Sequence, residues 1–290
     1  MAMCTLAPAT TADAATSDAS PFAAAYARLA EVLPILRVTE AAPGERLPHG
    51  GGWVRAAELA EGGEALDSFL AWDDEQMRRD YGKQARPDVI ASIGLHRYAW
   101  PVCLLVTVPW FLHRRVPRVP VEAVAFDRTA GRMTVRIEEF SCLPGDPAAR
   151  LPGARVVADA EALRTAVREA TAEHLAPVLD AFRPRMRRGP RALWGMATDE
   201  ITDGLWYVGH LLGEERRAMA EAERLLPGSV EPYPRGAGFR ELSGPNGEKL
   251  PTRDRVSCCL FYTVRPEDTC VTCPRTCDAE RVERLTRSST

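Results

Sequence analysis

Apolar residues recur at intervals of three and four positions over long stretches of this chain, which is the spacing of amphipathic helices. In the first half, this pattern predicts a helix over residues 21–36 and helical structure again over 53–81. A Gly- and Pro-rich stretch over 42–52 separates them and is predicted to be a loop. The chain therefore begins its folded part with helices.

The second half carries two longer patterns of the same kind. Asp159 is predicted to be the N-cap of a long helix, because its carboxylate can accept hydrogen bonds from the first free backbone N–H groups. A further helix is predicted from about Arg191 to Leu226, and the Gly- and Pro-rich segment 227–251 is predicted to be a long loop. The positions expected to face the core are Leu163, Val167, Ala170, Val178, Phe182, Leu193, Ala197, Ile201, Leu205, Val208 and Leu212.

One region has the composition of paired strands. Residues 119–126 and 132–140 are rich in Val, Ile, Phe and Thr, and the turn-forming residues 127–131 separate them. This arrangement predicts a β-hairpin near 119–140, the one clear sheet signal in the pattern. The charge-free apolar stretch 99–112 is too short for a transmembrane segment and contains two prolines, so we expect it in the core. Within it, the block 102–112 fits either a strand or a buried helix.

These patterns predict an α+β fold that is mainly helical. We expect a disordered leader over 1–20, an N-terminal lobe over 21–145 that contains the hairpin, a helical lobe over 154–252, and a cysteine-rich segment over 253–280. The Pro- and Gly-rich residues 143–153 mark the predicted boundary between the lobes. With 290 residues and 46% hydrophobic content, the chain is long enough to bury a sizeable core.

Charge and targeting signals narrow the classes of function. The 37 basic and 40 acidic residues are interspersed and give a formal net charge of -3, so nucleic acid is not the expected partner. Residues 1–20 have no basic residue ahead of their apolar ones, unlike a secretory signal. We therefore expect a cytoplasmic protein, in which clustered cysteines point to metal binding more than to disulfides.

Five of the eight cysteines lie between Cys258 and Cys277. Cys258 and Cys259 are adjacent, and after ten intervening residues come Cys270 and Cys273, which gives the pattern C-C-x10-C-x2-C. A C-x2-C turn brings two sulfurs to one metal, and the ten-residue excursion lets the chain return with the other pair. Side chains of adjacent residues diverge in an extended chain, so the first pair needs a bent backbone.

The adjacent pair helps to separate the groups that could bind here. Structural zinc commonly uses two separated pairs around one small ion, whereas a two-iron cluster is a larger target with two metal centres. A disulfide between Cys258 and Cys259 is disfavoured, because consecutive α-carbons are only about 3.8 Å apart. An iron–sulfur cluster is favoured, and zinc or metal-free thiols are the alternatives. Cys277 is either a substitute ligand or a free thiol on the C-terminal tail.

The sequence around these cysteines resembles a known family. Residues 255–262, Arg-Val-Ser-Cys-Cys-Leu-Phe-Tyr, with 270–274, Cys-Val-Thr-Cys-Pro, resemble the C-terminal signature of the FhuF-like ferric siderophore reductases. Residues 191–195, Arg-Ala-Leu-Trp-Gly, resemble a second segment of that family. The resemblance implies a [2Fe-2S] cluster whose ligands are Cys258, Cys259, Cys270 and Cys273.

The function implied by the resemblance is one-electron reduction of a ferric siderophore, with release of Fe(II) in the cytoplasm for iron acquisition. A [2Fe-2S] cluster passes single electrons, and hard oxygen ligands hold Fe(II) much more weakly than Fe(III). No Gly-rich dinucleotide-binding motif follows a predicted strand, so we expect a separate cytoplasmic electron donor. The alternatives are a non-enzymatic iron–sulfur redox sensor or electron carrier, and a zinc-stabilised binding protein.

Arginines near the cysteines are candidate functional groups. The basic run over 183–191 either holds an anionic ferric chelate or an acidic electron donor, or is a solvated loop between two helices. Arg253 and Arg255 lie close in sequence to Cys258, and we expect their positive charge to stabilise the reduced cluster.

Aromatic and histidine side chains are less specific candidates. Trp194, Trp206 and Tyr207 either contact a planar ligand or pack in the core, since aromatic residues at helical spacing usually do the latter. His174 and His210 are expected to be ordinary helix residues rather than ligands.

Overall fold

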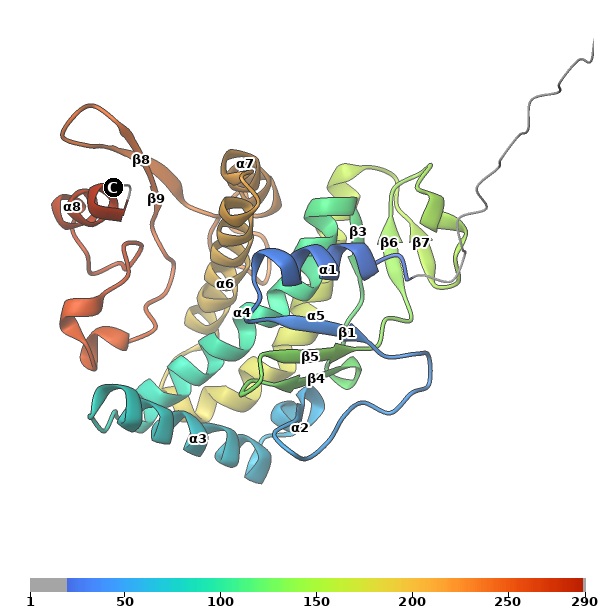
Figure 1. Ribbon diagram of the computed structural model, residues 1–290, viewed down its shortest axis with the longest axis horizontal. Coiled ribbons are helices and arrows are strands. Elements are labelled where there is room, and N and C mark those ends of the chain that lie inside the picture. Colours follow the sequence, from blue (N-terminus) through green and yellow to red (C-terminus); the bar gives the residue numbers. More distant parts are fainter. Residues whose placement is uncertain (1–19, 289–290) are drawn as a thin grey trace, which may run out of the picture.

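The structure is a computed structural model that describes residues 20–288 (Figure 1). The predicted leader lies outside the described residues except for Ser20, and Cys4 lies outside them too. The fold is α+β and mainly helical, as predicted. The helices are α1 (Ala23–Val32), α2 (Ala56–Glu61), α3 (Gly63–Tyr81), α4 (Pro87–His113), α5 (Ala160–Met186), α6 (Pro190–Leu211), α7 (Glu215–Leu225) and α8 (Asp278–Ser288).

The strands are short and form three small sheets. They are β1 (Arg37–Glu40), β2 (Val54–Arg55), β3 (Arg115–Pro117), β4 (Val124–Asp127), β5 (Arg132–Val135), β6 (Phe140–Cys142), β7 (Ala154–Val156), β8 (Phe239–Ser243) and β9 (Lys249–Arg253). The sheet orders are β1-β5-β4-β2, β3-β6-β7 and β8-β9. The predicted hairpin is confirmed as the antiparallel pair β4 and β5, while Phe140 belongs to β6 in the neighbouring sheet.

Helix α4 lies at the centre of the fold and settles the ambiguity over residues 102–112, which are helical. It packs against α5 and α6, and its two internal prolines, Pro101 and Pro109, do not end it. By length and composition alone α4 could cross a membrane, but 83% of its most apolar window is buried inside the protein. This is the burial expected of a core helix, as predicted for this stretch.

The long helix after residue 153 begins as predicted. The side chain of Asp159 accepts hydrogen bonds from the backbone N–H groups of Glu161 and Ala162, both at 2.9 Å. The predicted inward positions of α5 are buried, among them Leu163, with no exposed side-chain area, and Phe182. One hydrophobic cluster contains core residues from both predicted lobes, and the division of the chain into lobes stays a prediction.

Two predictions for the second half were wrong in part. The single helix expected from Arg191 to Leu226 is interrupted between α6 and α7, where Gly213 has a left-handed φ of +73°. Both helices bury the same kind of apolar side chains, so the spacing continues across the break. The loop expected over 227–251 contains most of the β8–β9 hairpin, whose strands are too short to show a clear period.

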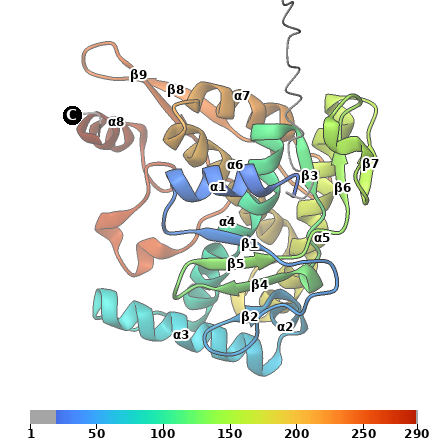
Figure 2. The same cartoon turned by 45° about the vertical axis from the view of Figure 1, so that its right-hand side comes forward.

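The segment expected to be helical over 53–81 also differs in detail. It begins with β2 and then forms α2 and α3, which are separated at Gly62, where φ is +77°. Beyond these helices, the chain reaches the cysteine-rich segment only after β9. Figures 1 and 2 both place this segment on the opposite side of α6 from the β3-β6-β7 sheet.

Candidate metal centre

A bent backbone brings the cysteine pair out of the β8–β9 hairpin. After β9, the chain bends at Val256 and Ser257, and Leu260 adopts a left-handed conformation with φ of 68°. The bend predicted around Cys258 and Cys259 is therefore present. A left-handed leucine costs about 1 kcal/mol or more, and Leu260 is held there by packing against a small hydrophobic cluster that includes Val264.

The ten-residue excursion then returns the second pair of cysteines. Two short 3₁₀ turns, Phe261–Thr263 and Pro266–Asp268, fill it. The N–H of Cys273 donates a 3.0 Å hydrogen bond to the carbonyl oxygen of Cys270, which closes the C-x2-C turn as the spacing predicted. Helix α8 follows directly.

The four predicted ligand cysteines line one pocket of about 260 Å³. Cys273 is only 5% exposed and Cys258 and Cys259 are half-buried, whereas Cys270 is exposed. Cys277 is exposed and does not line this pocket. The other lining residues are Ile93, His96, Arg97, Arg255, Phe261, Tyr262, Asp268 and Thr269.

Close sulfur pairs occupy this pocket. The Cys258 thiol is hydrogen-bonded to that of Cys273, and Cys259 lies within electrostatic range of Cys270. Burial raises the pKa of both Cys258 and Cys259. A metal centre overcomes this cost because it binds the thiolate form.

Hydrogen-bond donors already point at the sulfurs. The backbone N–H of Leu260 donates to Cys258 Sγ at 3.4 Å, and the hydroxyl of Thr272 donates to Cys270 Sγ at 3.7 Å. Such donors stabilise negative charge on sulfur, which favours bound clusters and tunes their reduction potential.

The donor set matches a two-metal iron–sulfur group in number and chemistry. Among residues 20–288, no three His, Cys, Asp or Glu side chains are gathered as the shell of one metal ion. Four thiols instead share one pocket, with Cys258 beside Cys273 and Cys259 near Cys270. A [2Fe-2S] cluster takes four thiolates in total, and this number and chemistry of donors match it.

Helix α6 anchors the backbone just before the cysteine pair. The carboxylate of Asp199, which has no exposed area, accepts hydrogen bonds from the backbone N–H of Val256 at 2.9 Å and of Ser257 at 2.8 Å. Burial raises the pKa of Asp199 to about 6, and the positive charges of Arg253 and Arg255 act in the opposite direction. Asp199 was not identified from the sequence pattern, in which it is one of two adjacent acids in the middle of a predicted helix.

The two candidate arginines lie at the site, but acidic side chains already neutralise them. Arg253 is fully buried and contacts Asp199 at 2.7 Å and Asp203 at 2.5 Å. Arg255 contacts Asp203 at 3.2 Å and Glu200 at 3.4 Å, and it lines the cysteine pocket. Arg255 is therefore the one of the two placed to act on a bound cluster, while Arg253 ties β9 to α6.

One member of the basic run reaches the cysteines directly. Arg188 donates to the carbonyl oxygen of Cys258 at 2.5 Å and to Ser257 Oγ at 3.2 Å. The run is not a loop, because Arg183 and Arg185 lie in the last turns of α5 and Arg191 lies in α6. Only its short central part connects the helices.

A glycine allows α6 to approach the cysteine segment closely. A β-carbon on Gly195 would lie 2.9 Å from a methyl carbon of Val256 and 3.5 Å from the β-carbon of Ser257. Gly195 ends the segment 191–195 that was identified by resemblance. Its lack of a side chain is thus a packing requirement of the contact between α6 and the bend.

The aromatic and histidine candidates divide between two environments. Trp194 packs edge-on against Tyr233, with ring centres 5.6 Å apart, and is a core contact. Trp206, Tyr207 and His210 instead line a second cavity of about 430 Å³, which Cys270 also lines.

His174 is an ordinary buried residue, as expected. Its ring nitrogens contact the Tyr98 hydroxyl at 2.7 Å and the Val119 carbonyl oxygen at 2.6 Å. Burial lowers its pKa to about 4.

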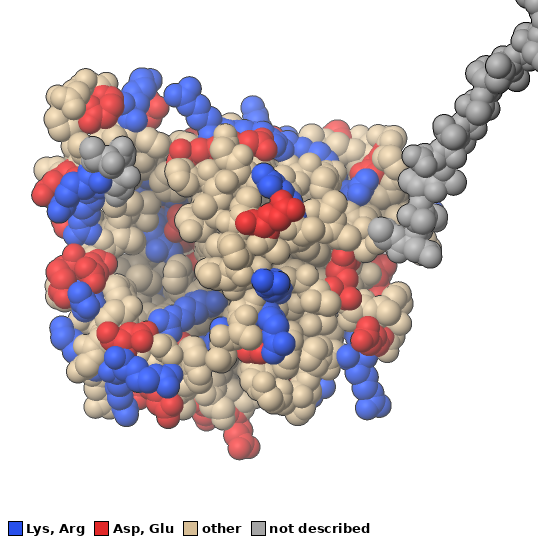
Figure 3. Space-filling view, viewed as in Figure 1, with Lys and Arg blue, Asp and Glu red and all other residues tan. Residues whose placement is uncertain are grey.

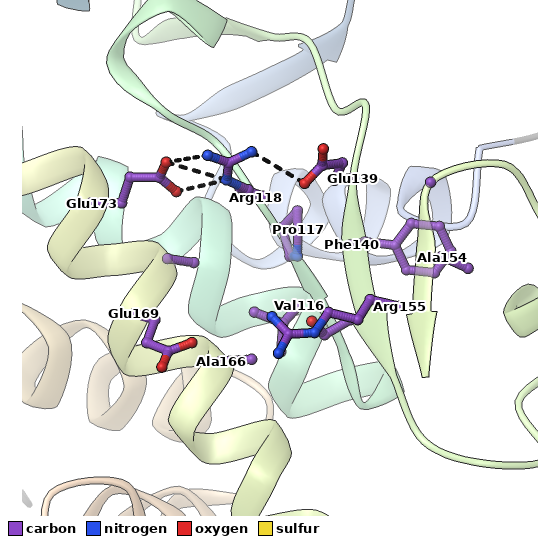
Figure 4. Close-up of a pocket in the computed structure, with 13 residues that line it drawn as sticks. Val116, Pro117, Arg118, Glu139, Phe140, Ala154, Arg155, Ala166, Glu169 and Glu173 are labelled. Atoms are coloured by element: carbon purple, nitrogen blue, oxygen red, sulfur yellow. Dashed lines mark hydrogen bonds and ion pairs between the residues drawn. The ribbon is translucent and has the colours of Figure 1, made fainter. Parts of the chain in front are cut away.

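A further cavity lies away from the cysteines, between the β3-β6-β7 sheet and α5 (Figure 4). Figure 4 shows Arg118 held between Glu173 and Glu139 at its margin. The lining contains no cysteine, and Arg118 is already paired with carboxylates.

Comparison with known proteins agrees with this geometry. Residues 255–275 match the FhuF 2Fe-2S C-terminal domain, and this span contains the four cysteines of the shared pocket. No curated protein matches the chain at a significant level. The resemblance that the cysteine spacing indicated is confirmed: the chain carries a C-terminal domain of the FhuF family, whose cofactor is a [2Fe-2S] cluster.

Proposed function

We propose that this protein is a cytoplasmic ferric siderophore reductase, with Cys258, Cys259, Cys270 and Cys273 as the ligands of its cluster. The observation that carries the proposal is the match to a 2Fe-2S domain over a segment whose four thiols line one pocket. When bound, such a cluster supplies one electron at a time, the number that converts Fe(III) to Fe(II).

The surrounding residues support a site that holds charge and stays rigid. Asp199 and Arg188 fix the backbone at Ser257 and Cys258, so that the sulfur positions depend on helix α6 and its N-terminal connection. The N–H of Leu260 and the hydroxyl of Thr272 donate toward sulfur. Arg255 lines the pocket and is held in place by Asp203 and Glu200, so its guanidinium lies beside a bound cluster.

Partial exposure supports electron exchange with external partners. Cys270 is exposed, so one edge of the site faces solvent while Cys273 is buried. Figure 3 shows the surface hollowed between the C-terminal segment, at the left of the view, and the helical body. We propose that a separate protein donates the electron and that the ferric chelate accepts it without forming a bond to the protein.

Anaerobic reconstitution and single-turnover kinetics test the proposal. Protein purified anaerobically is reduced with dithionite, freed of excess reductant and mixed with a ferric trihydroxamate. Reduction weakens the visible absorption of the cluster. We expect the ferric chelate to restore this absorption while about one Fe(II) per cluster appears in a ferrous-specific dye assay. Cys259→Ser protein is the matched control and should release no Fe(II).

The same experiment separates a reductase from an electron carrier. An iron-free one-electron acceptor of matched potential is compared with the ferric chelate. Reoxidation that is no faster with the chelate than with this acceptor would reject the reductase and favour a non-enzymatic redox role.

A further inference from the structure

A second cavity shares a wall with the cysteine pocket. It has a volume of about 430 Å³ and is bounded mainly by side chains from α4 and α6. His96, Arg255 and Cys270 line both cavities. The two spaces are therefore neighbours, and Cys270 is the one of the four pocket cysteines that reaches this second cavity.

Aromatic rings form the apolar part of this wall. Trp100 and Tyr207 contact each other with ring centres 5.9 Å apart, and Trp206 packs edge-on against Phe239 at 5.3 Å. Tyr207 nevertheless stays 47% exposed, so one face of the aromatic wall is open to solvent. Rings that are fixed on one side and open on the other suit an organic ligand with an apolar surface.

The basic side chains around the cavity each lie beside a carboxylate. His96 contacts Glu200 at 2.5 Å, His210 lies 3.6 Å from Glu215, and Arg255 is engaged by Asp203 and Glu200. Trp206 Nε1 also donates to Glu215 at 2.8 Å. Arg255, His96 and His210 thus each have a carboxylate beside them, so the wall offers little attraction to a strongly anionic ligand.

We propose that this aromatic cavity is the docking site for a ferric chelate of low net charge, and that electrons leave the protein at Cys270. The inference rests on the proposed function and assigns its substrate site. In the step, one electron passes from the reduced protein to Fe(III), which becomes Fe(II). No covalent bond forms or breaks, and an external one-electron donor restores the reduced protein.

Redox-inert gallium chelates test docking separately from reduction. Ga(III) has the charge of Fe(III) but is not reduced under these conditions, so its complexes report binding alone. The probes are the Ga(III) complexes of a synthetic hexadentate trihydroxamate, which is uncharged, and of a synthetic tricatecholate, which carries three negative charges. Binding to the oxidised, cluster-containing full chain is measured by titration calorimetry.

Tyr207→Ala is the principal variant, because the side chain is exposed and its removal leaves the core intact. We expect the Kd of the uncharged complex to rise about tenfold, and Tyr207→Phe to keep most of the affinity. Ile35→Ala removes another exposed apolar side chain, 74% exposed and outside the cavity lining, and should bind like wild type. With the corresponding ferric complex, Tyr207→Ala should raise KM with little change in kcat.

Glu215→Gln tests the charge argument. Its side-chain oxygen can still accept from Trp206, but the negative charge is gone. We expect wild type to bind the tricatecholate complex with a Kd at least tenfold higher than that of the uncharged complex. In Glu215→Gln, the ratio of these two Kd values should fall severalfold.

The outcomes separate the docking site from the reductase activity. The docking proposal is overturned if Tyr207→Ala binds the uncharged complex with a Kd within twofold of the wild-type value. It is also overturned if wild type binds both gallium complexes equally well, even if reduction proceeds. Tyr207-dependent binding of the gallium complex without chelate-specific reoxidation would support the docking site and reject the reductase.

Discussion

The carboxylate of Asp199 accepts a 2.8 Å hydrogen bond from the backbone N–H of Ser257, the residue immediately before the cysteine pair. A second bond from Val256 gives the same carboxylate two contacts to the bend, and Arg253 neutralises its charge. A buried carboxylate in the middle of α6 therefore fixes the chain from which Cys258 and Cys259 project. Helix α6 supports both the proposed cluster site and one wall of the aromatic cavity.

Replacing Asp199 by Asn should weaken the fold and the site together. The amide cannot balance buried Arg253 and can donate where the carboxylate accepts, so we expect a loss of about 3 kcal/mol in the free energy of unfolding. Urea unfolding measures this loss, and iron and sulfide assays should show substoichiometric cluster.

Asp180→Asn provides the control for this change. The Asp180 side chain is 75% exposed on α5, so the same substitution there should alter stability by less than about 0.5 kcal/mol. Full cluster occupancy and wild-type stability in Asp199→Asn would show that the contact to the bend is dispensable.

Gly195→Ala tests the close approach of α6 to the bend. Gly to Ala normally stabilises a helix by up to about 1 kcal/mol, but here the new carbon would lie 2.9 Å from a Val256 methyl. We expect a net destabilisation of about 1–3 kcal/mol and faster loss of the cluster in air. Thermal unfolding and the decay of visible absorption measure the two effects.

Gly189→Ala is the matched comparison, because nothing lies within 4 Å of a β-carbon built at Gly189, at the start of the same helix. If Gly195→Ala retained its cluster as long as Gly189→Ala, the contact with Val256 would not govern the site.

The sequence pattern predicted the cysteines of the site more completely than the residues that support them. The C-C-x10-C-x2-C spacing identified the four thiols of one pocket, because local spacing limits which sulfurs can meet. Asp199 and Arg188 were missed as supporting residues, since their partners lie more than fifty positions away in the sequence. Such contacts depend on how α6 meets the bend, which periodicity does not encode.

The helices show the same limit in the fold. Periodicity located α1, α5 and most of α6, whose apolar faces are long enough to repeat. It missed the break at Gly213, because the apolar spacing continues from one helix to the next. It also missed the strands outside the β4–β5 hairpin, because strands of two to five residues leave little periodic signal. The hairpin of β4 and β5 was found because a turn-rich sequence separates its two halves.

Arg188→Leu should shift the reduction potential of the cluster to more negative values. Arg188 places a positive charge against the carbonyl of Cys258, and its removal disfavours the added electron. The lost hydrogen bonds should also cost about 1 kcal/mol of stability, since the side chain is half-buried. An EPR-monitored redox titration measures the potential.

Arg183→Leu, from the same basic run, is the control for loss of charge. Arg183 is 51% exposed and lies 3.9 Å from Asp180, so its replacement should leave the potential near that of wild type. Equal potentials in the two variants would remove Arg188 from the electrostatics of the site.

Single cysteine variants test the ligand set. Cys259→Ser should bind little or no cluster, because serine lacks the thiolate and Cys259 is half-buried in the shared pocket. Cys277→Ser should keep the wild-type absorption and EPR spectra, because Cys277 lies outside that pocket. Spectra of anaerobically purified proteins, with iron and sulfide per chain, measure both. A wild-type spectrum from Cys259→Ser would reassign the ligand, with Cys277 as the next candidate.

His174 gives the fold a pH dependence that can be measured independently of the cluster cysteines. It is held neutral between Tyr98 and the carbonyl of Val119, and burial lowers its pKa from 6.5 to about 4. The unfolded chain therefore takes up a proton near pH 6.5 that the folded chain takes up only near pH 4, so stability falls as pH falls through this window.

Between pH 7 and 4.5, the free energy of unfolding of wild type should fall by about 2 kcal/mol more than that of His174→Gln, whose amide cannot titrate. Urea unfolding at each pH measures the difference, and His49→Gln, which alters an exposed histidine, should follow wild type. Parallel pH profiles for wild type and His174→Gln would mean that this ring does not resist protonation in the folded state.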